Sequence, residues 1–152
     1  MSIQKLKSLI ILFKTHQHLT SNIKLSLSET ELTVNEFTVL EALYTKGELS
    51  TQQLIDKILI PNSSMTYVLD VLEKKNYIER KKDKKDRRRQ HLSLTASGAA
   101  VFLEIYDIHY NHMTKIFEVL TPEEEVVLRN LLKKIGKKAQ ELSVWIMLNT
   151  TE

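Results

Sequence analysis

The chain has 152 residues, enough for one domain with a hydrophobic core but too few for that core plus a separate catalytic domain. Three glycines and two prolines leave few sites for tight turns, which favours long helices over a many-stranded sheet. The net charge is +3, and the absence of cysteine excludes disulfides, thiolate metal sites and sensing by cysteine oxidation.

The first helix is predicted over residues 3–27, where apolar side chains recur near one stripe. The stripe consists of Leu9, Leu12, His16, Leu19, Ile23 and Leu27. In a chain this small, it must pack against the last helix or a second subunit. The apolar run Leu9–Phe13 is too short to span a bilayer, and a signal-peptide arrangement is absent. We therefore expect a soluble, cytoplasmic protein.

Two short helices follow, and each begins with a capping-box pattern. Thr33 and Glu36 begin the first of them, and Gly47 supplies its end. Ser50 and Gln53 begin the second in the same way, and it is predicted to end near residue 60.

A further helix is predicted over residues 62–75, with Asn62 as its N-cap. Its buried side is predicted to consist of Met65, Val68, Leu69 and Leu72. Its opposite side presents Ser63, Ser64, Thr66, Tyr67 and Asp70. Two short helices joined by a tight turn, the second with small polar side chains on its outer side, are typical of a helix-turn-helix. Periodicity alone would equally allow two helices that merely pack in a helical protein.

The segment from Lys74 to His91 is strongly basic and is predicted to form a hairpin. Its strands are expected at 77–82 and 90–94, on either side of a charged tip at 83–89. The segment contains ten lysines and arginines against three acids, a net charge of +7, so the rest of the chain carries −4. One concentrated positive patch on an acidic body is the electrostatic footprint of a protein that meets phosphates at one place. The alternative is a solvated basic run.

Two long helices are predicted after the hairpin. Thr95 begins the first, which extends to about residue 119, and Thr121 with Pro122 begins the second. The last helix carries a seven-residue apolar repeat that only Lys138 interrupts. The repeat consists of Leu128, Leu131, Ile135, Leu142 and Trp145. Such a narrow stripe indicates a helix that meets another helix along a seam, either within the chain or across a dimer.

The ordered motifs of the basic segment resemble the signature of the MarR family of winged helix-turn-helix transcriptional regulators. These motifs are Leu72-Glu73-Lys74-Lys75, Arg80, Asp83-x-x-Asp86-Arg87-Arg88 and Leu92-Ser93-Leu94-Thr95-x-x-Gly98. The order of the flanking helices is similar over nearly the whole chain. Two departures are Tyr67, where the family often has arginine, and Asn76, where glycine commonly ends the helix. Asparagine suits this place because it tolerates the left-handed conformation.

The resemblance implies a mainly α fold. Three helices and a two-stranded β wing would form a winged helix-turn-helix DNA-binding lobe at residues 30–97. Helices at 1–29 and 98–152 would form the dimerisation region of a single MarR-like domain, residues 1–152. The implied function is that of a homodimeric transcriptional regulator, expected to be a repressor that a small-molecule effector releases from a palindromic operator in double-stranded DNA.

The resemblance also implies roles for individual residues. The third helix of the lobe would enter the major groove, with contacts from Asn62, Ser63, Ser64, Thr66 and Tyr67. The wing would contact DNA through Lys82, Lys84, Lys85, Arg87, Arg88 and Arg89. Arg88 would enter the adjacent minor groove, and Asp86 would hold Arg88 or Arg80 in place.

Other classes of function have less support. There is no phosphate-binding glycine loop, nucleophile elbow or cysteine nucleophile, so we do not expect an enzyme, and no cofactor is implied. His109 and His112 share one helical face and could bind a metal with His16 or His18, although histidines at surfaces and interfaces are commoner than metal ligands. The remaining alternative is a winged-helix module that binds protein or nonspecific nucleic acid without regulating a promoter.

Overall fold

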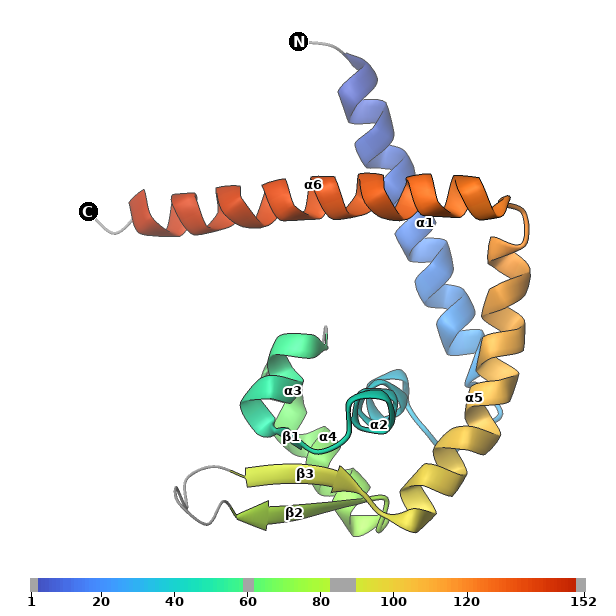
Figure 1. The fold of residues 1–152 in the computed structure, drawn as a ribbon, viewed down its shortest axis with the longest axis vertical. Helices are drawn as coiled ribbons and strands as arrows, with labels where there is room; N and C mark the ends of the chain where they lie inside the picture. The colour runs from blue at the N-terminus through green and yellow to red at the C-terminus, as the bar shows by residue number, and fades with distance from the viewer. Residues whose placement is uncertain (1–2, 59–61, 83–89, 150–152) are drawn as a thin grey trace. The chain divides into compact units, whose positions relative to one another are not determined.

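The computed structural model describes residues 3–58, 62–82 and 90–149, which form six helices and three short strands (Figure 1). The chain divides into two compact units, Met1–Met113 and Thr114–Glu152. The elements are α1 (Ile3–Ser26), α2 (Val34–Lys46), β1 (Leu49–Ser50), α3 (Thr51–Lys57), α4 (Asn62–Lys74), β2 (Ile78–Lys82), β3 (Gln90–Leu94), α5 (Ala96–Phe117) and α6 (Pro122–Asn149). The predicted mainly α fold with a two-stranded wing is confirmed.

The sheet has one strand more than the wing that was predicted. Its order is β1-β3-β2, with both pairs antiparallel. The two-residue strand β1 pairs Leu49 with Leu92 of β3, so the turn between α2 and α3 is hydrogen bonded to the base of the wing (Figure 1). A strand of two residues is too short to produce an alternating pattern, and only its partner strand reveals it.

The predicted starts of α2 and α3 are confirmed as capping boxes. The Glu36 carboxylate accepts from the Thr33 main-chain N–H at 2.7 Å, and the Thr33 hydroxyl accepts from the Glu36 N–H at 3.2 Å. Ser50 and Gln53 make the equivalent pair of bonds at 3.2 and 2.8 Å. Gly47 ends α2 with φ of 74°, a left-handed value that glycine adopts without a side-chain clash.

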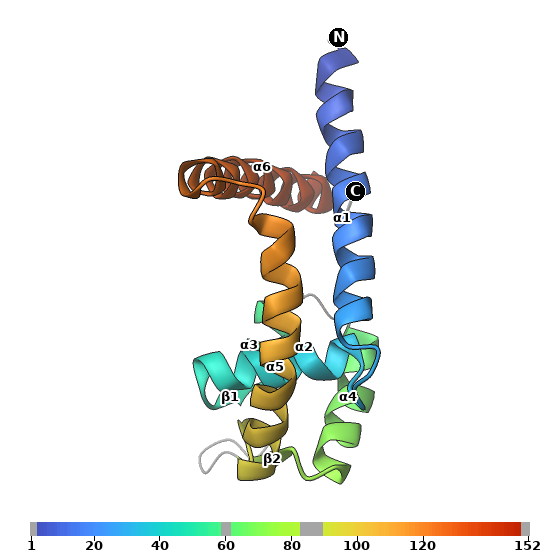
Figure 2. The same ribbon diagram turned by 90° about the vertical axis from the view of Figure 1, so that its right-hand side faces the viewer.

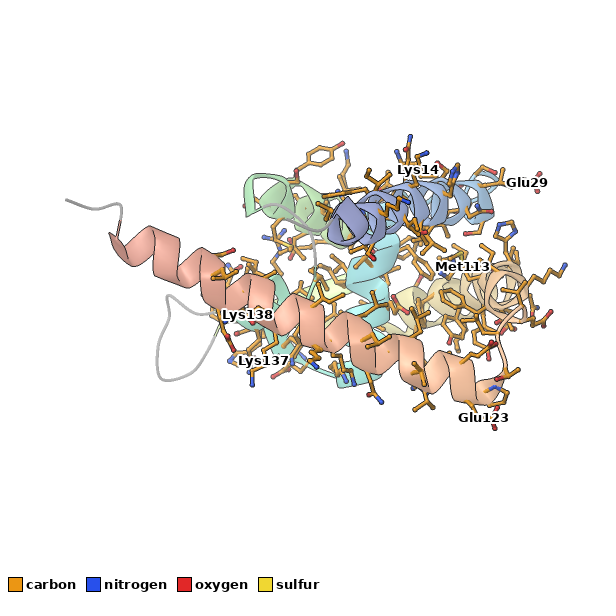
Figure 3. All side chains as sticks on the ribbon, turned by 90° about the horizontal axis from the view of Figure 1, so that it is seen from above. Lys14, Glu29, Met113, Glu123, Lys137 and Lys138 are labelled. Atoms are coloured by element: carbon orange, nitrogen blue, oxygen red, sulfur yellow. The ribbon has the colours of Figure 1, made fainter. Side chains whose placement is uncertain are left out.

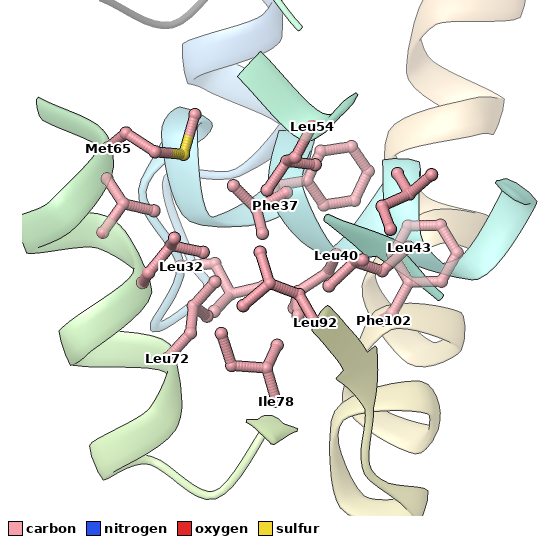
Figure 4. Packing of buried hydrophobic residues seen from close by; sticks show 14 of the residues in the cluster. Leu32, Phe37, Leu40, Leu43, Leu54, Met65, Leu72, Ile78, Leu92 and Phe102 are labelled. Carbon is pink, nitrogen blue, oxygen red and sulfur yellow. The ribbon is translucent and has the colours of Figure 1, made fainter. Parts of the chain in front are cut away.

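The hydrophobic core joins the helix-turn-helix to the sheet and to α5 (Figure 4). Side chains from α2 and α4 meet Ile78 of β2, Leu92 of β3 and Phe102 of α5. The predicted inner side of α4 is confirmed, since its four apolar residues Met65, Val68, Leu69 and Leu72 are all buried. Because these residues occupy the inner side, the opposite side of α4 is turned away from the core.

The C-terminal part of α1 lies beside α5 in the first unit (Figures 1 and 2). Two polar contacts join the helices. Ser26 Oγ lies 2.8 Å from His109 Nδ1, and Asn22 Oδ1 lies 3.0 Å from His112 Nε2. The His109 ring also packs against Phe37 of α2, with ring centroids 4.8 Å apart. These contacts attach both long helices to the helix-turn-helix.

The second unit consists of the end of α5 and the long helix α6. Thr121 and Glu124 form a capping box at the start of α6, with bonds of 2.9 and 3.2 Å. Lys137 and Lys138 project from the second half of the helix (Figure 3). Most of the described apolar side chains of α6 are exposed, among them Leu131, Ile135 and Leu142 of the predicted stripe.

Candidate nucleic-acid interface

The outer side of α4 is available to a partner. Thr66 and Asp70 are exposed, Ser64 is half-buried, and the side chain of Tyr67 has an exposed fraction of 72%. The side chains of Asn62 and Ser63, also predicted to contact DNA, lie outside the part of the chain that the structure describes. Polar and aromatic groups on one exposed side of a short helix can hydrogen bond to base edges or phosphates and can pack against a base.

The end of α4 is closed by Asn76, which adopts φ of 58°. The Asn76 N–H donates to the Glu73 carbonyl and the Tyr77 N–H to the Leu72 carbonyl, both at 2.9 Å. These two bonds form a Schellman motif, which satisfies carbonyls that the helix end would leave unpaired. The expectation that asparagine would take the left-handed place is confirmed. The chain can therefore reverse direction directly into β2.

Lys75 attaches the end of α4 to the start of α2. Its ammonium group lies 3.2 Å from the Glu36 carboxylate and donates to the Glu31 carbonyl at 3.0 Å. Glu36 has an exposed fraction of only 4%, and its other carboxylate oxygen accepts from Thr33. A buried carboxylate that is both paired and hydrogen bonded is satisfied. This pair therefore sets where α4 lies on the rest of the helix-turn-helix.

Arg80 connects α4 to the wing. From the middle of β2, its guanidinium forms ion pairs with Asp70 and with Glu73 of α4, the Nε–Oε2 distance to Glu73 being 3.0 Å. The Arg80 side chain has an exposed fraction of 17%. One arginine held by two carboxylates on successive turns fixes the direction in which the hairpin leaves the helix.

The structure does not describe the partner that the sequence predicted for this arginine. Asp86, proposed from sequence as a brace for Arg88 or Arg80, lies outside the described residues, as do Lys84, Lys85, Arg87, Arg88 and Arg89. Asp70 and Glu73 were not predicted as partners of Arg80. Their spacing of three residues on one helical face was the available signal, but only the antiparallel return of β2 identifies the arginine that they meet.

The described part of the wing has a regular register. Ile78 pairs with Leu94 and Lys82 with Gln90, so the strands remain paired as far as Lys82. Lys82 is exposed. Lys81 lies 2.8 Å from Glu79, and this hydrogen bond together with the lysine's charge lowers the pKa of the Glu79 carboxyl. The two side chains partly neutralise each other on the strand, so the described positive charge near the tip rests mainly on Lys82.

The base of the wing is attached to α5 by Thr95 and Gly98. The Thr95 N–H donates to the Tyr77 carbonyl at 3.1 Å, and its hydroxyl donates to the Asn76 carbonyl at 2.6 Å and accepts from the Gly98 N–H at 3.0 Å. A Cβ atom at Gly98 would lie 1.9 Å from the Tyr77 oxygen. Glycine at this place therefore permits a close contact between α5 and the turn that ends α4.

The predicted metal-binding histidines have other neighbours. His109 and His112 each place a ring nitrogen against α1, and burial, followed by the charge of His112, lowers the pKa of His109. His16 instead lines a cavity on the α2 side of α1. Within residues 3–58, 62–82 and 90–149, no group of three histidine, aspartate or glutamate side chains is arranged to hold a metal ion.

A cavity of about 680 Å³ lies in the first unit between α1, α2 and the end of α3. Its size is typical of sites for small molecules. Ile23, Val34 and Ala42 contribute apolar lining, and Thr38 and Glu41 of α2 contribute polar groups. The first helix and the helix-turn-helix thus border an open cavity that a small molecule could fill.

Comparisons with known proteins agree with this geometry. The model of the MarR family matches residues 32–89. The HTH-type transcriptional regulator MhqR of Bacillus subtilis is 33% identical over 141 residues, covering 93% of this chain and 97% of that protein. Two solved structures, of Bordetella bronchiseptica BpsR and of NadR, have TM-scores of 0.74 and 0.72 at 25% and 30% identity. They cover 83% and 84% of this chain and 90% and 91% of their own chains.

Among the described residues, no helix is both long enough and apolar enough to cross a membrane. The exposed side of α4, the wing attached to it through Arg80 and the match to MhqR over nearly the full length of both proteins lead to one conclusion. The chain belongs to the MarR family of winged helix-turn-helix transcriptional regulators.

Proposed function

We propose that this chain is a regulator that binds an operator in double-stranded DNA and is released from it by a small molecule. The observation that carries the proposal is the attachment of the wing to the exposed helix α4 through Arg80, Asp70 and Glu73. A helix and a hairpin held in one fixed geometry can occupy a major groove and the neighbouring minor groove together.

The outer side of α4 is the proposed reader of the major groove. Asn62, Ser63, Ser64 and Thr66 would contact phosphates and base edges, because short polar side chains accept and donate hydrogen bonds to either. Tyr67 stands where the family often has arginine, so the bidentate contact of arginine with guanine is absent at this place. The exposed tyrosine ring would instead pack against a base, with its hydroxyl free to bond a phosphate.

The tip of the wing supplies the proposed minor-groove contact. Arg88 would enter the groove, where narrow A·T-rich sequences concentrate negative potential. Asp86 would hold the arginine side chain in the orientation that enters the groove. The phosphate contacts are proposed for Lys82, Lys84, Lys85, Arg87 and Arg89.

The acting form is proposed to be a homodimer. Residues 1–29 and 98–152 would form the dimerisation region around a DNA-binding lobe at residues 30–97. Exposed apolar side chains support this division, since Leu9–Phe13 of α1 and Leu131, Ile135 and Leu142 of the α6 stripe are exposed. A symmetric dimer binds two half-sites about one helical turn apart, which requires a palindromic operator.

The relatives support control by a small molecule. NadR was solved in complex with 4-hydroxyphenylacetate, and 6-hydroxynicotinic acid regulates DNA binding by BpsR. We propose that an effector of this chain acts from the cavity beside α2 and that the chain works as a repressor. The relatives are regulators rather than enzymes, and the proposed role is likewise non-catalytic and in the cytoplasm.

Selection of bound sequences from random duplex DNA tests this function. We expect recovery of a palindrome whose half-sites are separated by one helical turn, followed by release from it when an effector is added. A protein that merely binds nucleic acid or another protein would enrich no such symmetric sequence, and that result would refute the proposal.

The dependence of operator affinity on salt is a first quantitative prediction. If each of two subunits neutralises about four phosphates, the logarithm of the association constant should fall against the logarithm of salt concentration with a slope of roughly −7. Fluorescence anisotropy with a labelled operator over a range of salt concentrations measures the slope. A slope near zero would contradict the proposed contacts from the basic wing.

The Arg80→Ala variant tests the attachment of the wing. We expect operator affinity to fall about tenfold, because the variant removes both ion pairs that hold the hairpin against α4. Lys81→Ala is the matched control, since it removes one positive charge from the next residue of the same strand and leaves those ion pairs intact. Equal losses in the two variants would show that Arg80 contributes only its charge.

A further inference from the structure

The described lining of the cavity between α1, α2 and α3 contains one acidic side chain, that of Glu41. Glu41 lies near the middle of α2, on the side of the helix that also directs Thr38, Ala42 and Thr45 into the cavity. Counted from Thr38, the four residues stand at i, i+3, i+4 and i+7, which is the spacing of a single helical face. The acid is therefore part of the cavity wall.

The Glu41 carboxylate is unpaired within the part of the chain that the structure describes. No described residue donates a hydrogen bond to it or forms an ion pair with it; the Thr45 hydroxyl donates to the main-chain carbonyl of Glu41 instead, at 2.8 Å. The side chain is half-buried, and burial is the cause that raises the pKa of the Glu41 carboxyl. The Glu41 oxygens still reach solvent, so water supplies their donors when no ligand is bound. A ligand that displaces this water without bringing a donor would bury the acceptor unsatisfied, whereas a ligand that brings a donor avoids that cost.

The two lysines of the described cavity lining do not donate a hydrogen bond to the Glu41 carboxylate. Lys46 and Lys57 belong to the lining, but both side chains are exposed, so water and salt screen their charges. Neither forms an ion pair with Glu41. The rest of the described lining is mostly apolar or hydroxyl-bearing, as at Ile23, Val34 and Thr38, and it also includes the polar side chains of His16 and Asn35.

We infer that the cavity binds a small, mainly apolar molecule with a hydroxyl group, and that this hydroxyl donates its hydrogen bond to the Glu41 carboxylate. The inference rests on the proposed function, because it assigns the ligand class and the selecting residue of the effector site. A site that offers an unpaired acceptor rejects an analogue without the donor, since that analogue buries the acceptor and leaves it unsatisfied.

Two matched compounds test the inference on the purified full-length chain. 4-Hydroxyphenylacetamide and 4-methoxyphenylacetamide have the same frame, but only the first carries a hydroxyl donor. By isothermal titration calorimetry, the wild-type chain should bind the hydroxyl compound at least about tenfold more tightly, since a hydrogen bond to a charged group contributes that much. Equal affinities, or no binding of the hydroxyl compound at millimolar concentration, would overturn the inference.

Variants then test whether Glu41 causes the preference for the hydroxyl compound. Glu41→Met removes the acceptor at similar volume, and its preference for the hydroxyl compound should shrink to less than about threefold. Glu29→Met is the control, because Glu29 is an exposed acid outside the cavity lining (Figure 3), and it should keep the wild-type preference. A wild-type preference in Glu41→Met would overturn the assignment. If that variant does not fold, the wild-type comparison alone decides.

Operator binding measured without added compound distinguishes failure of the ligand assignment from failure of the proposed regulator function. A preparation that binds the selected palindrome but does not distinguish the two compounds refutes the ligand assignment and leaves the regulator function standing. A preparation that binds no duplex preferentially refutes the regulator function itself.

Discussion

The Gly98→Ala variant is expected to lose about 3 kcal/mol or more of its unfolding free energy. The added Cβ would lie 1.9 Å from the Tyr77 carbonyl oxygen and 2.7 Å from its carbon. Both are backbone atoms, and the same carbonyl accepts from the Thr95 N–H, so neither side can move without breaking the junction between α5 and the wing. Urea denaturation followed by circular dichroism measures the loss.

Gly136→Ala is the matched control for this prediction. Gly136 also lies within a helix, but a Cβ there would meet no atom within 4 Å. Alanine has the higher helix propensity, so the control should gain up to about 1 kcal/mol. If Gly98→Ala were as stable as Gly136→Ala, the close approach of α5 to Tyr77 would be wrong.

The Arg88→Ala variant is expected to weaken binding to the selected operator by about 1 to 3 kcal/mol. An arginine in a narrow minor groove displaces ordered water and is attracted by the concentrated negative potential there. The alanine side chain is too short and uncharged to do either. Titration of labelled operator at one fixed salt concentration measures the change. Far-ultraviolet circular dichroism should remain that of the wild type.

Arg129→Ala is the control for the loss of one arginine charge. Arg129 is an exposed residue of α6 whose ion pair with Glu125 spans 3.6 Å, so its removal should change operator affinity little. An operator affinity unchanged in Arg88→Ala would mean that another wing residue enters the minor groove. A loss confined to the palindrome and absent on random duplex would support a specific contact.

Local features of the fold could be predicted because their partners lie a few residues away. The capping boxes at Thr33 and Ser50 and the left-handed Asn76 depend on bonds to residues within about five positions. The buried side of α4 also followed from sequence, since a helical period assigns one face without reference to what covers it. The short strand β1 escaped prediction, because it exists through its pairing with β3.

Features of the candidate site that join distant residues could not be predicted. The sequence singled out Arg80 as the base of the wing, yet its carboxylate partners are Asp70 and Glu73 of α4 rather than a wing residue among those described. Glu36 was predicted as a cap, but its second role as the partner of Lys75, 39 positions away, was not. Glu41 drew no attention in the sequence because an acid on a helix is ordinarily solvated.

By itself, the sequence determined the kind of protein: helices with their starts and ends, a basic hairpin after a helix with a polar outer side, and the motifs of one family of regulators. These follow from bonds and periodicities that operate within a few residues. Only the tertiary structure decided which groups meet: Arg80 with α4, Gly98 with the Tyr77 carbonyl, and Glu41 with an open cavity. These contacts depend on how whole helices pack against one another. Packing brings together residues that are far apart along the chain, and no local sequence pattern indicates which of them will be in contact.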